Sequence, residues 1–298
     1  MNPVPQVTVF TATVYPDVAR LWYECVRRAF PPGVARFEIF YDAEGDGLPA
    51  DCFEGVHIVR RAPGRRDHHD AYNDAVRRAA TPYLAIIDTD VFWTNRELWP
   101  EVLRRLECPE TAAVSCVSRS RRKSHGTYAV VLKPEIYRQV LDKLPGGFYP
   151  GAEFLDPQVP MTQWRWFDTG DILTQAVMAA GHHIDLLHLD KTGELVRFYG
   201  ITLSRRGGRN FGPEALTLMA GKDRYFWRGY VCNLALRRVY QRVFRNGPSY
   251  DFPFRTAPLV LRSLRAKPST LAWRYGFLRH ILTGKRKIED FLREVPEP

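Results

Sequence analysis

Residues 83–90 decide the fold of this chain, and they read Tyr83-Leu84-Ala85-Ile86-Ile87-Asp88-Thr89-Asp90. A continuous apolar run of this length is typical of a buried strand in a parallel sheet. Acids at the carboxyl end of such a strand stand where open α/β sheets bind their ligands. Two carboxylates one residue apart can hold a divalent cation and a ribose hydroxyl together. We therefore expect Asp88 and Asp90 to lie in a ligand site.

Strands and helices alternate around this stretch. Apolar runs predict strands at residues 6–14, 37–41, 56–59, 112–117, 127–132 and 184–189, and helical spacing predicts helices at 17–30, 67–80, 97–106, 134–144 and 170–180. Such alternation predicts a doubly wound, mostly parallel α/β sheet. Residues 146–166, rich in Gly, Pro and aromatic residues, are expected to form a loop region on the acceptor side of the site.

The helix expected at 67–80 leads directly into the acidic strand. An apolar stripe at helical spacing is expected to pack on the sheet and comprises Tyr72, Ala75, Val76 and Ala79. A flank beside it, comprising Arg66, His69, Asn73 and Arg77, is expected to be solvated or to border the ligand cleft. We expect the N-terminal end of this helix at the edge of the sheet opposite the acids.

Composition limits the classes of protein. The chain has 298 residues, of which 45% are hydrophobic, and this is enough for a sizeable core. No apolar run approaches the length of a transmembrane helix, and the N-terminus lacks the pattern of a signal peptide. The five scattered cysteines without C-x-x-C spacing favour reduced thiols in the cytoplasm over a zinc site or a disulfide framework.

Charge is distributed unevenly. Residues 1–194 contain 22 Lys/Arg and 26 Asp/Glu, whereas residues 195–298 contain 21 Lys/Arg and 7 Asp/Glu. The pattern also becomes helical and aromatic beyond about residue 200. We therefore expect one domain over residues 1–200, with the acids at 88 and 90, and a basic, mainly helical C-terminal region over residues 201–298.

The stretch from Arg66 to Asp90 resembles the core of GT-A glycosyltransferases, especially the family 2-like branch. It shows a small-residue helix with the internal Asn73, followed by a hydrophobic strand that ends in D-x-D. The resemblance covers roughly residues 6–190. It implies a Rossmann-like GT-A fold, a nucleotide-diphosphate sugar donor and a Mn²⁺ or Mg²⁺ ion.

The resemblance also implies roles for individual residues. Asp90 would be the main metal ligand, Asp88 would bind the ribose or the metal through water, and His188 would add a metal ligand. The other residues implied in donor binding are Thr11 and Asp42 at the base, His69 and Asn73 on the helix, and Arg205, Arg206 and Arg209 at the diphosphate.

A second acid is expected near residue 168. In the inverting members of the resembling family an acid about a dozen residues before a helix-ending glycine deprotonates the acceptor hydroxyl, and this chain has Gly181. The usual Glu-Asp pair is absent, so either Asp168 or Asp171 could serve. Asp168 would also suit the N-cap of the following helix.

The basic tail suggests a partner. Residues 252–288 contain nine Lys/Arg and no acid, interleaved with aromatic and aliphatic residues, which suits the face of an anionic membrane. We expect a cytoplasmic enzyme, peripheral on the inner face of the membrane, that acts on a carbohydrate or lipid-linked acceptor. The sequence lacks a recognised nucleic-acid-binding motif.

Two alternatives stay open. A nucleotidyltransferase also places carboxylates beside a nucleotide, but it usually carries a glycine-rich loop after the first strand, and residues 11–16 contain no glycine. A non-catalytic scaffold would bind a membrane or nucleic acid through its basic tail, and its binding would not depend on Asp88 and Asp90.

Overall fold

The computed structural model describes residues 4–41, 53–60, 68–93, 97–116, 128–144, 146–148, 152–153, 165–166, 169–187 and 195–197. The chain divides into two compact units, one formed by residues 1–195 with 296–298 and the other by residues 196–295. The expected basic region at 201–298 lies outside the described residues. None of the described helices has the length and apolar content needed to cross a membrane.

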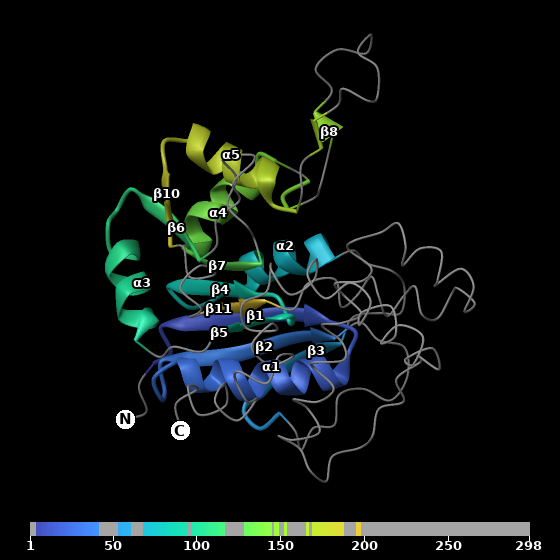
Figure 1. Ribbon diagram of the computed structural model, residues 1–298. Helices are drawn as coiled ribbons and strands as arrows, with labels where there is room; N and C mark the ends of the chain where they lie inside the picture. The colour runs from blue at the N-terminus through green and yellow to red at the C-terminus, as the bar shows by residue number, and fades with distance from the viewer. Residues whose placement is uncertain are drawn as a thin grey trace, which may run out of the picture. The chain divides into compact units, whose positions relative to one another are not determined.

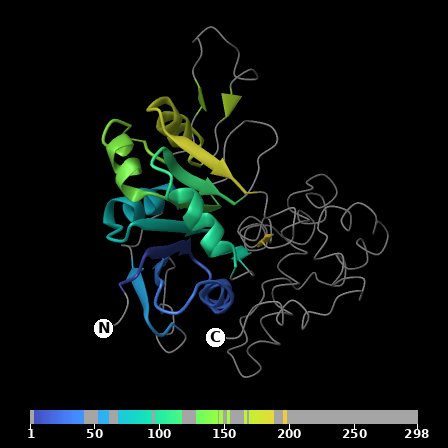
Figure 2. The ribbon, with the colours of Figure 1, turned by 90° about the vertical axis from the view of Figure 1, so that its left-hand side faces the viewer.

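Seven strands of the first unit form one sheet, in the order β10-β6-β7-β4-β1-β2-β3. Their bounds are β1 (Val7–Thr13), β2 (Ala35–Tyr41), β3 (Val56–Arg60), β4 (Tyr83–Ile87), β6 (Thr111–Ser115), β7 (Ala129–Leu132) and β10 (His183–Leu186). β7 runs antiparallel to both of its neighbours, and the other neighbouring strands are parallel. Figure 2 shows β10, in yellow, beside the green β6 at one end of the sheet. The prediction of a doubly wound, mostly parallel α/β sheet is confirmed.

Shorter strands lie outside this sheet. β8 (Ala152–Glu153) and β9 (Arg165–Trp166) form an antiparallel pair within the predicted loop region, β5 (Val91–Trp93) follows β4 after three residues, and the last described strand is β11 (Leu195–Arg197). The sequence pattern predicts none of these four, because two or three residues are too few to show a period.

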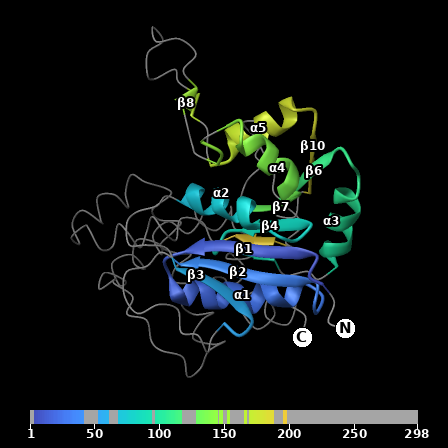
Figure 3. The same ribbon diagram turned by 180° about the vertical axis from the view of Figure 1, so that it is seen from behind.

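Helices cover both faces of the sheet. Their bounds are α1 (Pro16–Ala29), α2 (His68–Arg78), α3 (Leu98–Leu106), α4 (Pro134–Leu141) and α5 (Asp171–Ala179). Figures 1 and 3 show α1 on one face and α2 on the other. Pro16 and Pro134 begin α1 and α4, where a missing N–H costs no helical hydrogen bond.

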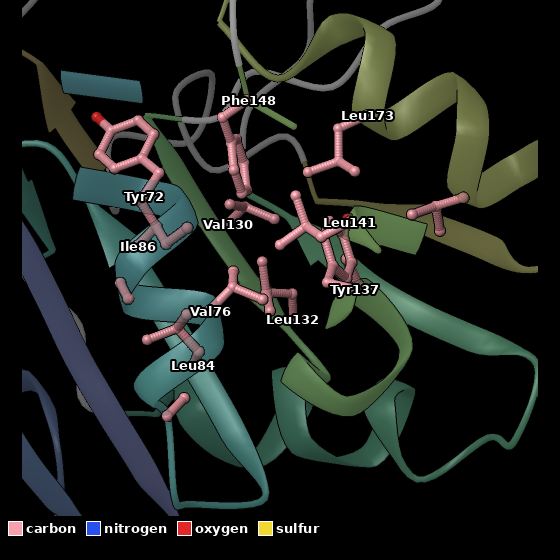
Figure 4. Packing of buried hydrophobic residues seen from close by; sticks show 14 of the residues in the cluster. Tyr72, Val76, Leu84, Ile86, Val130, Leu132, Tyr137, Leu141, Phe148 and Leu173 are labelled. Carbon is pink, nitrogen blue, oxygen red and sulfur yellow. The ribbon is translucent and has the colours of Figure 1, made fainter. Parts of the chain in front are cut away.

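The core on the α2 face joins α2, α4 and α5 to the sheet. Phe10 and Ile86 contribute from the strands, and the apolar stripe of α2 packs against them as predicted. Figure 4 shows Phe148 between Tyr72 and Leu173 in this core. The rings of Tyr72 and Phe148 meet edge to face, with their centroids 5.6 Å apart. The result is a packed layer that fixes α2 and the start of α5 relative to the carboxyl end of β4.

Candidate active site

The acidic motif forms a tight turn at the carboxyl end of β4. The amide of Val91 donates to the carbonyl of Asp88 at 2.9 Å, which closes residues 88–91 into a turn with Asp90 at its third position. The amide of Asp88 donates to the carbonyl of Tyr128 at 3.0 Å, so the turn is tied to the strand beside it. Asp88 and Asp90 are half-buried. A turn that is closed by its own hydrogen bond and tied to its neighbour holds its carboxylates at the sheet edge.

This turn stands where the order of the strands reverses. From β1 the chain continues outward to β2 and β3, and it then returns to place β4 on the other side of β1. The two central strands are in register, with Phe10 beside Ile86, so Asp88 leaves the sheet beside the last residues of β1. The crevice at such a reversal is the usual ligand position in open α/β sheets.

The N-terminal half of α2 lies at the same edge as the acids. The hydroxyl of Tyr72 donates a hydrogen bond to Asp88 Oδ1. The expectation that this end of α2 lies at the opposite edge is therefore wrong. Only a short link of residues 79–82 joins α2 to β4, so the helix runs antiparallel to the strand and begins where the strand ends.

The flank of α2 is only partly solvated. His69 and Asn73 are each 6% exposed, whereas Arg77 is exposed. The imidazole Nε2 of His69 lies 3.6 Å from Asp70 Oδ1. Asn73 is turned toward residues 146–148: its Oδ1 accepts from the amide of Phe148 at 3.0 Å, and its Nδ2 donates to the carbonyl of Gly146 at 3.3 Å. The structure thus gives Asn73 a contact with residues 146–148, in the loop region that is expected on the acceptor side.

The start of α5 lies close to the start of α2. His68 Nε2 and Thr169 Oγ1 are hydrogen-bonded at 2.9 Å. Asp171, in the first turn of α5, is fully buried. An acid at this position is favourable because it faces the positive end of the helix dipole. The site therefore comprises two acid-bearing segments, residues 88–90 and residues 169–171, both held by α2.

Other predicted site residues are less informative. Thr11 is fully buried in β1, and its hydroxyl has no hydrogen-bond partner among the described residues. Because side chains alternate along a strand, Thr11 lies on the face opposite to that of Phe10, which packs against α2. The predicted residues Asp42, Asp168, His188, Arg205, Arg206 and Arg209 lie outside the described residues.

A metal ion would have two carboxylate ligands here. Within the described part of the chain no three His, Cys, Asp or Glu side chains gather into a metal site. Mg²⁺ and similar hard cations at nucleotide sites commonly take one or two carboxylates and complete their shell with phosphate oxygens and water. The pair Asp88 and Asp90 fits that requirement. The described cysteines, Cys25, Cys108 and Cys116, are free thiols.

Tyr72, His68 and the 146–148 turn are parts of the candidate site that the sequence pattern does not predict. Tyr72 is assigned to the apolar stripe, and its ring does pack there. A signal was nonetheless present, because the hydroxyl of a buried tyrosine usually needs a polar partner. Figure 4 shows this hydroxyl pointing out of the apolar core. No pattern in the sequence pairs Asn73 with Gly146 and Phe148, which lie 73 and 75 positions further along the chain.

A comparison with known protein families finds a match for the central segment of the chain. Residues 47–159 match the sequence profile of glycosyl transferase family 2. The matched segment contains α2, β4 and the turn at residues 88–91, so the resemblance to GT-A glycosyltransferases is confirmed. The match supports a glycosyltransferase function. No curated protein is significantly similar in sequence.

The solved structures whose chains follow a similar course have low sequence identity to this chain. A mannosyltransferase from Pyrobaculum calidifontis, in complex with GDP-Man and Mn²⁺, is 18% identical, with 98% of this chain and 86% of that chain covered and a TM-score of 0.45. Glucosyl-3-phosphoglycerate synthase from Mycobacterium tuberculosis is 12% identical, with coverages of 62% and 70% and a TM-score of 0.42.

A synthase of 4-diphosphocytidyl-2C-methyl-D-erythritol from Anaerococcus prevotii is 8% identical, with coverages of 62% and 87% and a TM-score of 0.41. At this level of similarity none of the three decides which reaction this chain catalyses.

Proposed function

We propose that this chain is a metal-dependent glycosyltransferase that moves a sugar from a nucleotide-diphosphate sugar to an acceptor hydroxyl. The observation that supports it most is the anchored turn of Asp88, Thr89 and Asp90 at the strand reversal. This turn lies inside the segment that matches glycosyl transferase family 2. The catalytic domain would comprise residues 1–200.

Asp90 would hold the cation directly, and Asp88 would bind the ribose or the cation through water. A bound Mn²⁺ or Mg²⁺ would neutralise the negative charge that develops on the departing diphosphate. The Tyr72 hydroxyl keeps the Asp88 carboxylate oriented, since it donates to one of its two oxygens. The other Asp88 oxygen would face the ligand.

The acceptor hydroxyl has to lose its proton as the sugar is transferred. Asp171 is fully buried in the first turn of α5, which favours a structural role for its carboxylate. We therefore propose Asp168 as the general base. It directly precedes Thr169, the residue that is hydrogen-bonded to His68.

Binding of nucleotide sugars tests the proposal. A thermal-shift screen of nucleotide-diphosphate sugars, with and without Mn²⁺, should find a donor that raises the unfolding midpoint only when the metal is present. Asp90→Ala should lose this metal-dependent shift, whereas Asp142→Ala, at an exposed acid after α4, should keep it. A full shift in Asp90→Ala would contradict the proposal.

The products distinguish the alternatives. A glycosyltransferase releases a nucleoside diphosphate from a nucleotide sugar. A nucleotidyltransferase instead transfers the nucleoside monophosphate group of a nucleoside triphosphate to a phosphorylated acceptor and releases pyrophosphate. Chromatography of the nucleotide products with each substrate pair should show only the first reaction.

The acceptor and the location are further parts of the proposal. We propose a carbohydrate or lipid-linked acceptor and a cytoplasmic enzyme that meets the membrane through residues 252–288. Such binding rests on charge and should fall with salt. Co-sedimentation with vesicles rich in phosphatidylglycerol should therefore exceed that with phosphatidylcholine vesicles, and equal binding to both would contradict this part.

A further inference from the structure

The side-chain amide of Asn73 is fully engaged inside the protein. It accepts the amide of Phe148 and donates to the carbonyl of Gly146, so it bridges both ends of the 146–148 turn. The side chain is 6% exposed. A buried amide that makes two hydrogen bonds to backbone fixes the position of that backbone, because breaking either bond leaves a buried polar group without a partner.

Gly147 lies directly against this amide. A Cβ atom at residue 147 would stand 2.2 Å from Asn73 Oδ1 and 2.5 Å from Leu141 Cδ2. The residue also has φ of +52°, in the left-handed region that favours glycine. The turn can therefore close over Asn73 only with glycine at this position.

The 146–148 turn is hydrogen-bonded to the start of α5. The carbonyl of Phe148 accepts a hydrogen bond of 3.0 Å from the amide of Gly170, the N-cap residue of α5. The Phe148 ring packs against Tyr72 and Tyr137 in the core. A second tie from α2 reaches the same place, since His68 is hydrogen-bonded to Thr169. Two consecutive residues at the start of α5 are therefore held to α2. His68 holds Thr169 directly, and Gly170 is held through Phe148, whose amide is bonded to Asn73.

We infer that Asn73 is a positioning residue of the acceptor side: through the 146–148 turn it sets the place of residues 169–171 relative to the acids on β4. The inference rests on the proposed glycosyl transfer, in which Asp168, the residue before Thr169, is the base. It departs from the expectation that Asn73 contacts the donor, because both ends of its amide face backbone of residues 146–148.

Three variants test the contact between Asn73 and the 146–148 turn, two by changing Asn73 and one by changing the turn. Asn73→Ala removes both hydrogen bonds. Asn73→Asp keeps an acceptor for the Phe148 amide but sets a carboxylate oxygen against the carbonyl of Gly146. Gly147→Ala leaves Asn73 intact and forces the turn away from it. Arg77→Ala is the matched control, because Arg77 lies one helical turn further along α2 and is exposed.

The expected result is a loss of turnover without a loss of donor binding. For Asn73→Ala and Gly147→Ala we expect kcat for transfer to fall roughly 10- to 100-fold, as a displacement of about 1 Å in a reacting group does. The Kd of the nucleotide sugar with Mn²⁺, measured by calorimetry, should change less than about twofold. Asn73→Asp should lower kcat at least as far as Asn73→Ala, because it buries a carboxylate against the Gly146 carbonyl, and Arg77→Ala should match the wild type.

Hydrogen exchange gives a readout that does not depend on activity. The amides of Phe148 and Gly170 should exchange faster in Asn73→Ala and Gly147→Ala than in the wild type, while amides of β1 and β2 keep their protection. Where an Asn73 variant folds poorly, protection would fall throughout the sheet, and Gly147→Ala then perturbs the same contact with Asn73 left in place.

Two outcomes would overturn the inference. If Asn73→Ala weakens donor binding and leaves kcat unchanged, Asn73 contacts the donor. If the amide of Gly170 keeps its protection in the folded variants, Asn73 does not hold the start of α5. A wild-type chain that binds and turns over no nucleotide sugar would instead overturn the proposed function, and the exchange data would still decide whether Asn73 holds Gly170.

Discussion

Asp88 and Asp171 both belong to segments that the sequence places in the site, but the fold surrounds them differently. Asp88 is half-buried at the end of β4 and accepts a hydrogen bond from Tyr72. Asp171 is fully buried at the start of α5. A carboxylate that binds a metal or takes a proton has to reach its ligand. Under the proposed function, the half-buried Asp88 would therefore bind a ligand, whereas full burial favours a structural role for Asp171.

The largest effect is expected at Asp90, the partner of Asp88 in the turn. Asp90→Ala should lower kcat for metal-dependent transfer on the order of a thousandfold, because several kcal/mol of charge stabilisation by the cation are lost. Its unfolding midpoint should stay near that of the wild type, since Asp90 is half-buried in a turn. Initial rates with saturating donor and a thermal melt measure the two quantities.

Removal of the metal tests the same side of the comparison. EDTA should abolish transfer, and Mn²⁺ or Mg²⁺ added in excess should restore it, because two carboxylates and the donor phosphates hold a cation only reversibly. Full turnover after dialysis against EDTA would show that Asp88 and Asp90 act without a metal.

For Asp171 the opposite pattern is expected. Asp171→Ala should lower the free energy of unfolding by about 1–3 kcal/mol, because it leaves a cavity at a fully buried position and removes the acid at the start of α5. Urea titration followed by circular dichroism measures this loss. If Asp171→Asn keeps wild-type stability and yet loses transfer, Asp171 rather than Asp168 is the base, and the contrast between the two acids fails.

The smallest effect is expected for Tyr72→Phe, which removes only the hydroxyl that holds Asp88. The ring should stay in place against Phe10 and Phe148, since its apolar contacts are kept. We expect the half-saturating Mn²⁺ concentration to rise about tenfold, as is common when a group that orients a metal-binding side chain is lost. Tyr23→Phe is the control, because the hydroxyl of Tyr23 contacts the Glu54 carbonyl instead.

An unchanged Mn²⁺ requirement in Tyr72→Phe would mean that Asp88 needs no orientation by α2. The shared position of Asp88 and the start of α2 would then be a consequence of packing alone. The contrast with Asp171 would still stand on burial.

The sequence by itself determined the alternation of strands and helices, the stripe of α2 that packs on the sheet, and the acids at the end of β4. These features depend on local periodicity, and period 2 or 3.6 is visible in a single chain. Burial of the stripe and the order of the sheet confirm that reading.

Only the tertiary structure decided how the segments of the site meet. The contacts of Tyr72 with Asp88, of Asn73 with Gly146 and Phe148, and of His68 with Thr169 span 16 to 101 residues. No local pattern encodes such pairs, because a hydrogen bond across the fold depends on where whole helices settle. The direction of α2 is a different case. The short link to β4 makes the helix antiparallel to the strand, so its first turn lies at the edge of the acids and not at the opposite edge, as the sequence analysis expects.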